Sequence, residues 1–242
     1  MTTYRLIVVD TAAELAQLAA EHVAATLDLA LAQRDRAHIA LAGGETPRAA
    51  YQRLAAEHLP WERVDVLLGD ERWVSADDPA SNARMLSETL LAQGPGAKAR
   101  FHPVPTGLES PVASANAYAE LLQVICPGAP PCFDLILLGL GEDGHTASLF
   151  PGTSAPAVRD RWVTIGEGKG LPRITLTVPV LSAARQVIML VSGAGKAEAL
   201  RRLMDASESG DRTPARLVAP QAEVLILADV AAASTASLPF GS

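Results

Sequence analysis

Aromatic residues and cysteines are scarce in this sequence of 242 residues. Aromatic residues make up 4% of it, so a buried core has to be built mainly from alanine, leucine, valine and isoleucine. Cys126 and Cys132 are the only cysteines, too few for a disulfide framework and at a spacing that fits neither a redox pair nor a zinc site. The five histidines show no metal-ligand spacing either. The sequence therefore predicts no metal site.

Positive charge is also in short supply, since the formal net charge is −7. No basic patch stands out, which argues against nucleic acid as a partner, although a few local cations would still allow an anionic substrate. Long hydrophobic runs are missing as well. The apolar run that ends at Asp10 is too short for a signal peptide, and no later stretch could span a bilayer. We therefore expect no membrane partner and a cytoplasmic location.

Short apolar runs alternate with longer segments of helical period, in a composition that is 49% hydrophobic and 19% charged. The pattern predicts strands at 5–9, 38–42, 64–68, 133–138, 162–165, 174–178, 186–191 and 224–227. It predicts helices at 12–32, 47–56, 81–91, 110–125 and 196–204. Buried strands that are followed by helices indicate an α/β fold, a mostly parallel sheet with helices on both faces in a Rossmann-like open sandwich. No internal repeat or linker is evident, so we expect a single domain over residues 1–242.

Four of the predicted strands end in glycine-rich or charged turns, at 43–46, 69–72, 139–145 and 192–196. In open α/β sheets ligands bind at the carboxyl ends of the strands. We therefore predict that these four turns converge on one functional site.

Two of the turns are suited to an anion. Gly43 and Gly44 let the backbone approach a ligand closely, and the helix that follows offers amides at its N-terminus. Lys196 begins a later helix and can bind a phosphate as a point charge. It is not part of a P-loop, because Leu190 and Ala197 occupy positions that need glycine and a hydroxyl residue. Taken alone, the first turn is equally a plain strand-to-helix connection, and a solvated surface lysine remains the alternative for Lys196.

The turn at 139–144 matches the glycine pattern of dinucleotide-binding folds, but its context does not. Pro151 and Gly152 leave no room for the long helix that such folds need, and no acidic residue follows at the required distance. What remains is a turn that presents Asp143 and His145. A histidine beside a carboxylate can act as an oriented neutral base, or it can simply bond to local backbone.

The turn at 69–72 places two acidic residues before Arg72. A guanidinium can hold a phosphate or carboxylate through paired hydrogen bonds, so Arg72 is a candidate ligand for an anion. An exposed charged turn is the alternative interpretation of this segment.

In chain order, five motifs together resemble the 6-phosphogluconolactonase family, within the broader superfamily of glucosamine-6-phosphate isomerases. They are LAGGETP at 41–47, GDERWV at 69–74 with Ser81-Asn82, GLGEDGHTASLFP at 139–151, PRITLT at 172–177 and SGAGK at 192–196. The resemblance implies the sugar-phosphate isomerase type of α/β fold, hydrolysis of 6-phospho-D-glucono-1,5-lactone in the oxidative pentose phosphate pathway, and no cofactor or metal. The implied partner is a phosphorylated sugar lactone, and the protein is expected to be a monomer or a small homo-oligomer.

The resemblance also implies roles for particular residues. His145 is the expected general base, with Asp143 or Asp70 orienting it or a sugar hydroxyl. The phosphate is expected on the turn at 43–46, and the binding residues implied by the motifs are Gly43, Gly44, Thr46, Arg72, Asn82, Arg173 and Lys196. Asn82 is expected to bond sugar hydroxyls.

Two alternatives differ in chemistry. Glucosamine-6-phosphate deaminases of the superfamily carry a catalytic glutamate five residues after the histidine, where this sequence has Phe150. A phenyl ring cannot transfer a proton, so we expect no deaminase activity. A non-catalytic sugar-phosphate-binding regulator would usually carry a DNA-binding module, and strand and helix patterns leave no spare segment for one. Fold alone does not exclude that class.

Overall fold

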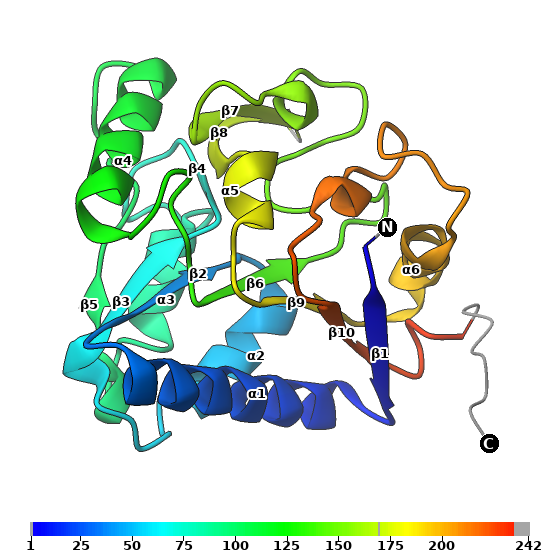
Figure 1. The fold of residues 1–242 in the computed structure, drawn as a ribbon, viewed down its shortest axis with the longest axis horizontal. Helices are drawn as coiled ribbons and strands as arrows, with labels where there is room; N and C mark the ends of the chain where they lie inside the picture. The colour runs from blue at the N-terminus through cyan, green and yellow to red at the C-terminus, as the bar shows by residue number, and fades with distance from the viewer. Residues whose placement is uncertain (1, 169, 235–242) are drawn as a thin grey trace.

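The computed structural model describes residues 2–168 and 170–234 (Figure 1). Seven strands form the main sheet, in the order β1-β10-β9-β6-β2-β3-β5, and every neighbouring pair is parallel. These strands are β1 (Tyr4–Val9), β10 (Val224–Asp229), β9 (Val187–Val191), β6 (Leu135–Gly139), β2 (Ala37–Leu41), β3 (Val64–Leu68) and β5 (Arg100–Phe101). A second, antiparallel sheet has the order β4-β8-β7 and consists of β4 (Asp70–Arg72), β8 (Leu171–Leu176) and β7 (Val163–Gly168).

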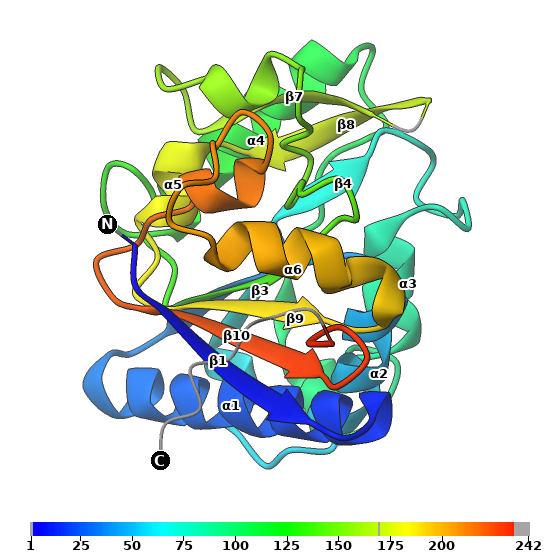
Figure 2. The same ribbon diagram turned by 90° about the vertical axis from the view of Figure 1, so that its right-hand side faces the viewer.

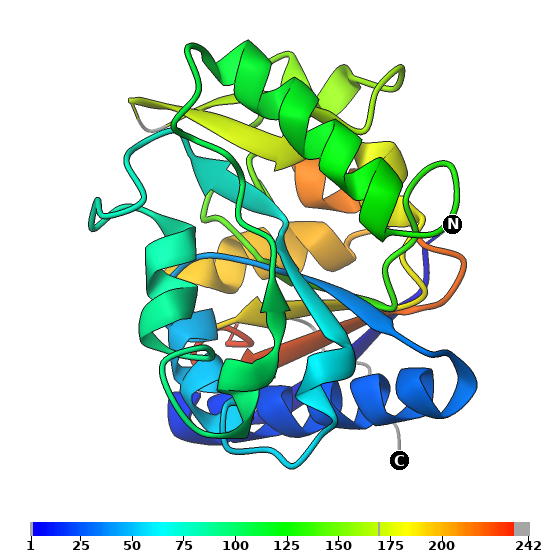
Figure 3. The same ribbon diagram turned by 90° about the vertical axis from the view of Figure 1, so that its left-hand side faces the viewer.

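The two faces of the main sheet are covered by different elements, as Figures 2 and 3 show. Helices α1 (Ala12–Gln33) and α2 (Glu45–Leu54) lie on one face, and α6 (Ala197–Met204) and the small sheet lie on the other. Helix α4 (Pro111–Ile125) packs against the small sheet. The remaining helices are α3 (Asn82–Glu88) and α5 (Val178–Ser182), with 3-10 turns η1 (Trp61–Arg63), η2 (Pro95–Lys98), η3 (Ala155–Ala157), η4 (Ala194–Lys196) and η5 (Pro214–Leu217).

Helix α1 shows how the sequence specifies these layers. Thr11 and Glu14 form a capping box, in which each side chain accepts a hydrogen bond from the other residue's backbone amide. Its buried face includes Leu15, Val23 and Leu27, spaced so that they lie along one side of the helix. A helix with this apolar stripe is stable once the stripe packs on the sheet.

The structure confirms the α/β fold with a mostly parallel sheet, but several segments depart from the sequence prediction, including β5 and α5, which it did not contain. The predicted strands at 162–165 and 174–178 are not members of the parallel sheet, since β7 and β8 form an antiparallel hairpin. The segment at 69–72, predicted as a turn, continues as β4 and pairs with β8. The hairpin was missed because an apolar run indicates burial and does not encode the direction of the neighbouring strand. The strand β4 was missed because its charged composition is that of a turn, and only the pairing with β8 makes it a strand.

Gly69 is the single residue between β3 and β4. Its amide donates to the carbonyl of Leu41 at the end of β2, and its carbonyl accepts from the amide of Leu176 at the end of β8. The chain therefore passes from one sheet into the other through a residue that is hydrogen-bonded to both. One continuous hydrophobic cluster contains core residues of both sheets, among them Leu137 and Ile174. That continuity supports the single-domain prediction, which stays a prediction.

Over the described ranges, the helices are all too short or too polar to cross a membrane.

Candidate functional site

A cavity of about 330 Å³ opens at the carboxyl ends of the parallel strands. All four of the turns singled out in the sequence contribute to its wall, together with β8. The lining residues that the sequence predicted are Gly43, Gly44, Thr46, Asp70, Arg72, His145, Arg173 and Lys196. The predicted residues Asp143 and Asn82 stand behind this wall and contact residues that form it. The fold thus brings together segments that are far apart in the chain, such as those of Gly43 and Lys196.

His145 is held at one of its two ring nitrogens. Nδ1 lies 2.5 Å from Oδ1 of Asp143, and the same oxygen accepts the backbone N–H of His145 at 3.1 Å. A Cβ atom at Gly141 would lie 1.9 Å from that Nδ1, so only glycine leaves room for the imidazole at this place. With Nδ1 directed at Asp143, the tautomer that donates from Nδ1 carries its basic lone pair on Nε2.

The imidazole also contacts an aromatic ring. The centroids of the His145 and Phe150 rings are 4.3 Å apart, with an angle of 34° between the ring planes. The guanidinium carbon of Arg173 lies 5.4 Å from the centroid of the same Phe150 ring. Sequence reasoning treated Phe150 only as the lack of a glutamate, and it missed these contacts because one depends on the conformation of the loop after β6 and the other on the position of β8.

Asp70 lies in β4, and its side chain is almost fully buried. One carboxylate oxygen accepts the hydroxyl of Ser148 at 2.5 Å and lies 3.7 Å from Nη1 of Arg173. Arg173 is itself buried, and burial lowers the pKa of its guanidinium while the nearby Asp70 opposes that shift. Arginine stays protonated after such a shift, so Asp70 and Arg173 form a charge-balanced pair at the cavity wall.

Arg72 is held from behind by the chain that leads into α3. Its Nη1 donates to the carbonyl of Ala80 at 2.5 Å, whereas its buried Nε has no hydrogen-bond partner within the part of the chain that the structure describes. A buried N–H is costly unless it is paired, and Arg72 lines the cavity.

Glu71, the neighbour of both site residues in β4, faces away from the cavity and serves the fold. Its carboxylate accepts the backbone amides of Asn82 and Ala83 at the start of α3, at 2.8 and 2.7 Å. Burial raises the pKa of Glu71, and these amide hydrogen bonds oppose the rise. Glu71 thereby fixes β4 to the first turn of α3, where a negative charge also meets the positive end of the helix.

Asn82 supports the turn at Gly43 from behind. Its side chain is buried, and Nδ2 donates to the carbonyl of Asp70 at 2.8 Å. A Cβ atom at Gly43 would lie 1.9 Å from Oδ1 of Asn82, so the glycine is needed for the backbone to pass this amide. The predicted role of Asn82 in binding sugar hydroxyls stays untested, and its observed contacts are with the backbone of two cavity-lining residues.

Lys196 ends the 3-10 turn η4 that follows β9, and its Nζ lies 3.9 Å from Glu142. The turn is anchored by Asp229, which ends the adjacent strand β10. Its carboxylate accepts the hydroxyl of Ser192 at 2.5 Å and the amide of Gly193 at 3.0 Å. Burial alone would raise the pKa of Asp229, but these hydrogen bonds hold it below the ordinary value. Sequence reasoning missed Asp229, although an acidic residue at the end of a buried strand is a signal for such a role.

A larger hollow of about 680 Å³ lies at the opposite, amino-terminal edge of the main sheet, between α1 and the segments before β6 and β9. Its charged lining residues, Arg34, Arg185 and Asp134, already pair with one another. None of the predicted site residues lines it. The side chains that line the two hollows therefore favour the smaller cavity as the functional site. Within residues 2–168 and 170–234, no three His, Cys, Asp or Glu side chains gather as metal ligands would.

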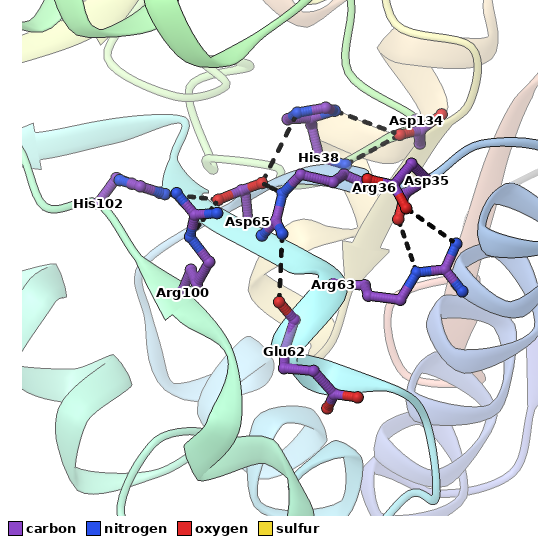
Figure 4. A network of polar contacts seen from close by, with 9 residues as sticks. All are labelled: Asp35, Arg36, His38, Glu62, Arg63, Asp65, Arg100, His102 and Asp134. Carbon is purple, nitrogen blue, oxygen red and sulfur yellow. Dashed lines mark hydrogen bonds and ion pairs between the residues drawn. The ribbon is translucent and has the colours of Figure 1, made fainter.

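The same amino-terminal edge carries a network of buried charges, shown in Figure 4. Asp65 of β3 accepts from Nε of Arg36 at 2.5 Å and lies 2.7 Å from Nε2 of His102. His38 lies 3.8 Å from both Asp65 and Asp134. Burial alone would raise the pKa of Asp65, but its hydrogen bonds with Arg36 and His102 hold it below the ordinary value. The network stabilises the end of the sheet away from the candidate site.

Comparison with known proteins places the chain among sugar-phosphate enzymes. A family model described as glucosamine-6-phosphate isomerases/6-phosphogluconolactonase matches residues 10–227. A 6-phosphogluconolactonase of Synechocystis is 45% identical over 203 residues, which is 83% of this chain and 85% of that protein. The solved structure of 6-phosphogluconolactonase from Trypanosoma brucei superposes with a TM-score of 0.86 at 30% identity, over 97% of this chain and 99% of that one.

A monomeric glucosamine-6-phosphate deaminase also superposes, with a TM-score of 0.81 over 96% of this chain and 99% of the other, at 23% identity. At that identity the likeness concerns the fold alone. The fold is therefore common to both chemistries, and the side chains in the cavity have to distinguish them.

Proposed function

Because this chain belongs to the glucosamine-6-phosphate isomerase/6-phosphogluconolactonase family, we propose that it hydrolyses 6-phospho-D-glucono-1,5-lactone to 6-phosphogluconate. The observation that carries the proposal is the meeting of the Asp143–His145 pair with Arg72, Arg173 and Lys196 around one cavity. The pair is suited to activate water, and the three cations are suited to a phosphorylated substrate. The reaction belongs to the oxidative pentose phosphate pathway, and the cytoplasmic location stays a prediction.

In the proposed mechanism, His145 acts as a general base through Nε2. It takes a proton from a water molecule as the water oxygen attacks the lactone carbonyl carbon, and the carbonyl oxygen becomes an oxyanion. Amides of the glycine-rich turns are candidates to stabilise that charge. The tetrahedral intermediate then collapses, the bond from the carbonyl carbon to the ring oxygen breaks, and the protonated His145 returns its proton to the departing oxygen. Asp143 stabilises the imidazolium that exists between these two steps.

The phosphate is proposed to bind where α2 begins. Gly44 precedes the helix with a φ of 111°, and no side chain caps the first turn, in which Glu45 and Thr46 carry amide N–H groups and Pro47 has none. Helix N-termini attract anions through these amides and through the helix dipole. Arg72 and Lys196 add positive charge on other sides of the same cavity. In this arrangement Asp70 accepts hydrogen bonds from the sugar hydroxyls, and Arg173 donates hydrogen bonds to them.

Deaminase activity is the alternative that this site argues against. In the deaminases of the superfamily the residue five positions after the histidine is a catalytic glutamate, and here that position is Phe150, whose ring packs against His145 and cannot transfer a proton. We therefore expect no release of ammonia from glucosamine 6-phosphate.

The proposal is tested by generating the lactone in situ from glucose 6-phosphate and following its loss above the spontaneous rate. Wild type should accelerate hydrolysis, and His145→Ala should lose at least about a hundredfold in kcat, the low end of what a general base contributes. His58→Ala is the matched control, since His58 is an exposed histidine outside the cavity. No acceleration by wild type would rule out the lactonase proposal, whereas an active His145→Ala variant would rule out only the assignment of the base.

A further inference from the structure

Phe150 makes contact with both sides of the catalytic cavity. Its ring lies against the imidazole of His145, and the guanidinium of Arg173 lies over the same ring. His145 belongs to the turn after β6 of the main sheet, whereas Arg173 belongs to β8 of the small sheet. One buried phenyl ring therefore connects the proposed base with a proposed substrate-binding cation from the other sheet.

The space for this ring is provided by Gly168 at the end of β7. A Cβ atom there would lie 2.4 Å from the ring of Phe150. The carbonyl of Gly168 also accepts a hydrogen bond from Nε of Arg173 at 3.4 Å. Gly168 thus supports Phe150 and Arg173 together, and any side chain at this position would displace the ring.

The hydrogen bond that Asp143 accepts fixes the position of Nδ1. The contact with Phe150 supplies a second constraint, on the ring face. Aromatic pairs favour tilted and offset arrangements, and a cation above a phenyl ring is attracted by its negative face. Both interactions strengthen when water is excluded, and Phe150 is 5% exposed.

We propose that Phe150 is a positioning residue that sets the orientation of His145 and of Arg173 together. The inference rests on the proposed lactonase function, to which it adds a residue that touches no substrate atom itself. It explains why an apolar residue occupies a position next to the base: a ring there fixes the direction of Nε2 and keeps the guanidinium of Arg173 in place opposite to Asp70. Such orientation has a large effect on the rate, because a small displacement of the base moves Nε2 away from the proton that it must take.

The test compares Phe150→Leu, which removes the ring and keeps apolar bulk, with Phe150→Tyr, which keeps the ring. Phe150→Leu should lower kcat by about tenfold, equivalent to about 1.4 kcal/mol of barrier, and raise KM through Arg173. Phe150→Tyr should recover most of the activity. Phe133→Leu is the matched control, because Phe133 is a fully buried phenylalanine that precedes β6 at the opposite edge of the main sheet. It should leave kcat and KM within about twofold of wild type, whatever it does to stability.

Gly168→Ala provides a second, independent perturbation, since it moves the ring without removing it and should reproduce the kinetics of Phe150→Leu. Histidine NMR supplies a readout that needs no substrate. The chain has five histidines, and the signals of His145 can be assigned by their loss in His145→Gln. The imidazole nitrogen shifts of His145 report its tautomer and its hydrogen bond with Asp143 rather than the nearby ring current, so both perturbations should change them.

Two results would overturn the positioning role: wild-type kcat in both Phe150→Leu and Gly168→Ala, or His145 signals that stay unchanged in both. If wild type fails to hydrolyse the lactone, the proposed function fails, and the NMR comparison still decides whether Phe150 orients His145.

Discussion

Replacing Gly43 with alanine should dislodge the buried side chain of Asn82. The added Cβ atom would lie 1.9 Å from Oδ1 of Asn82, 2.4 Å from its Cγ and 2.7 Å from its Nδ2. These distances are far below van der Waals contact, so the amide has to move. Asn82 is 1% exposed, and its Nδ2 donates to the carbonyl of Asp70, which means that any movement breaks a buried hydrogen bond.

The magnitude follows from that bond. Leaving a buried polar group unsatisfied costs about 1–3 kcal/mol, so Gly43→Ala is expected to lower the free energy of unfolding by at least about that amount. Asn82→Ala loses the same hydrogen bond. The double variant Gly43→Ala/Asn82→Ala loses it only once, so its destabilisation should fall short of the sum of the single effects by about 1–3 kcal/mol.

Urea denaturation of the four proteins measures this coupling energy directly. Gly107→Ala is the matched control, because nothing lies within 4 Å of a Cβ atom there and φ is not in the left-handed region. It should stay within about 0.5 kcal/mol of wild type. Additive effects of Gly43→Ala and Asn82→Ala would refute the steric reasoning. A normal stability of Asn82→Ala with a raised KM would instead favour the role in binding sugar hydroxyls.

Three further predictions concern charge. Lys196→Ala should raise KM for the phosphorylated lactone about tenfold or more, which is the effect of losing a charged hydrogen bond, and should not change KM for unphosphorylated gluconolactone. The control is Lys98→Ala, because Lys98 is exposed. Equal effects of Lys196→Ala on both lactones would mean that Lys196 does not bind the phosphate. The pKa of Asp65 is lowered in the folded state, so its contribution to stability is present above the ordinary value of 3.8 and is lost as pH falls through the lower folded value. Urea titrations should therefore show a loss in Asp65→Asn that is largest at pH 6 and shrinks toward pH 3, and a constant loss would contradict this. Asp229→Ala removes the acceptor for the Ser192 hydroxyl and the Gly193 amide, so it should lower the free energy of unfolding by about 1–3 kcal/mol. It should also raise KM, because the turn that carries Lys196 loses its anchor. An unchanged KM would mean that this turn keeps its conformation without Asp229.

The sequence was sufficient to predict that the glycine-rich and charged turns meet at one cavity. Parallel strands place their carboxyl ends at one edge, so turns after strands at Gly43, His145 and Lys196 had to meet whatever the details of packing. The sequence explained the glycines by close approach of the backbone to a ligand, and the structure adds that Asn82 lies on the Cβ side of Gly43 and His145 on that of Gly141. Local pattern and strand direction carry this information, and both are visible in one sequence.

What the sequence did not reveal depends on pairing between distant segments. Asp70-Glu71-Arg72 has the composition of an exposed turn, and it becomes a strand only because β8 lies beside it. Ser148 holds Asp70 across 78 positions, and Asp229 holds Ser192 across 37. Phe150 has no periodicity or charge that would suggest its position between His145 and Arg173. Such contacts arise from tertiary packing, which overrides local composition.

The short connection at Gly69 has a consequence for how well the cavity is ordered before a ligand binds. Asp70, Arg72 and Arg173 come from the small sheet, whereas Gly43, His145 and Lys196 come from the main sheet, so the cavity is a seam between two layers. Gly69 is the single residue that links β3 to β4, and it is hydrogen-bonded to both sheets, so this connection is too short to act as a hinge. These groups are already ordered in the folded protein, so ordering them costs little of the free energy of binding. We therefore expect the two sheets to keep their relative position when a ligand binds.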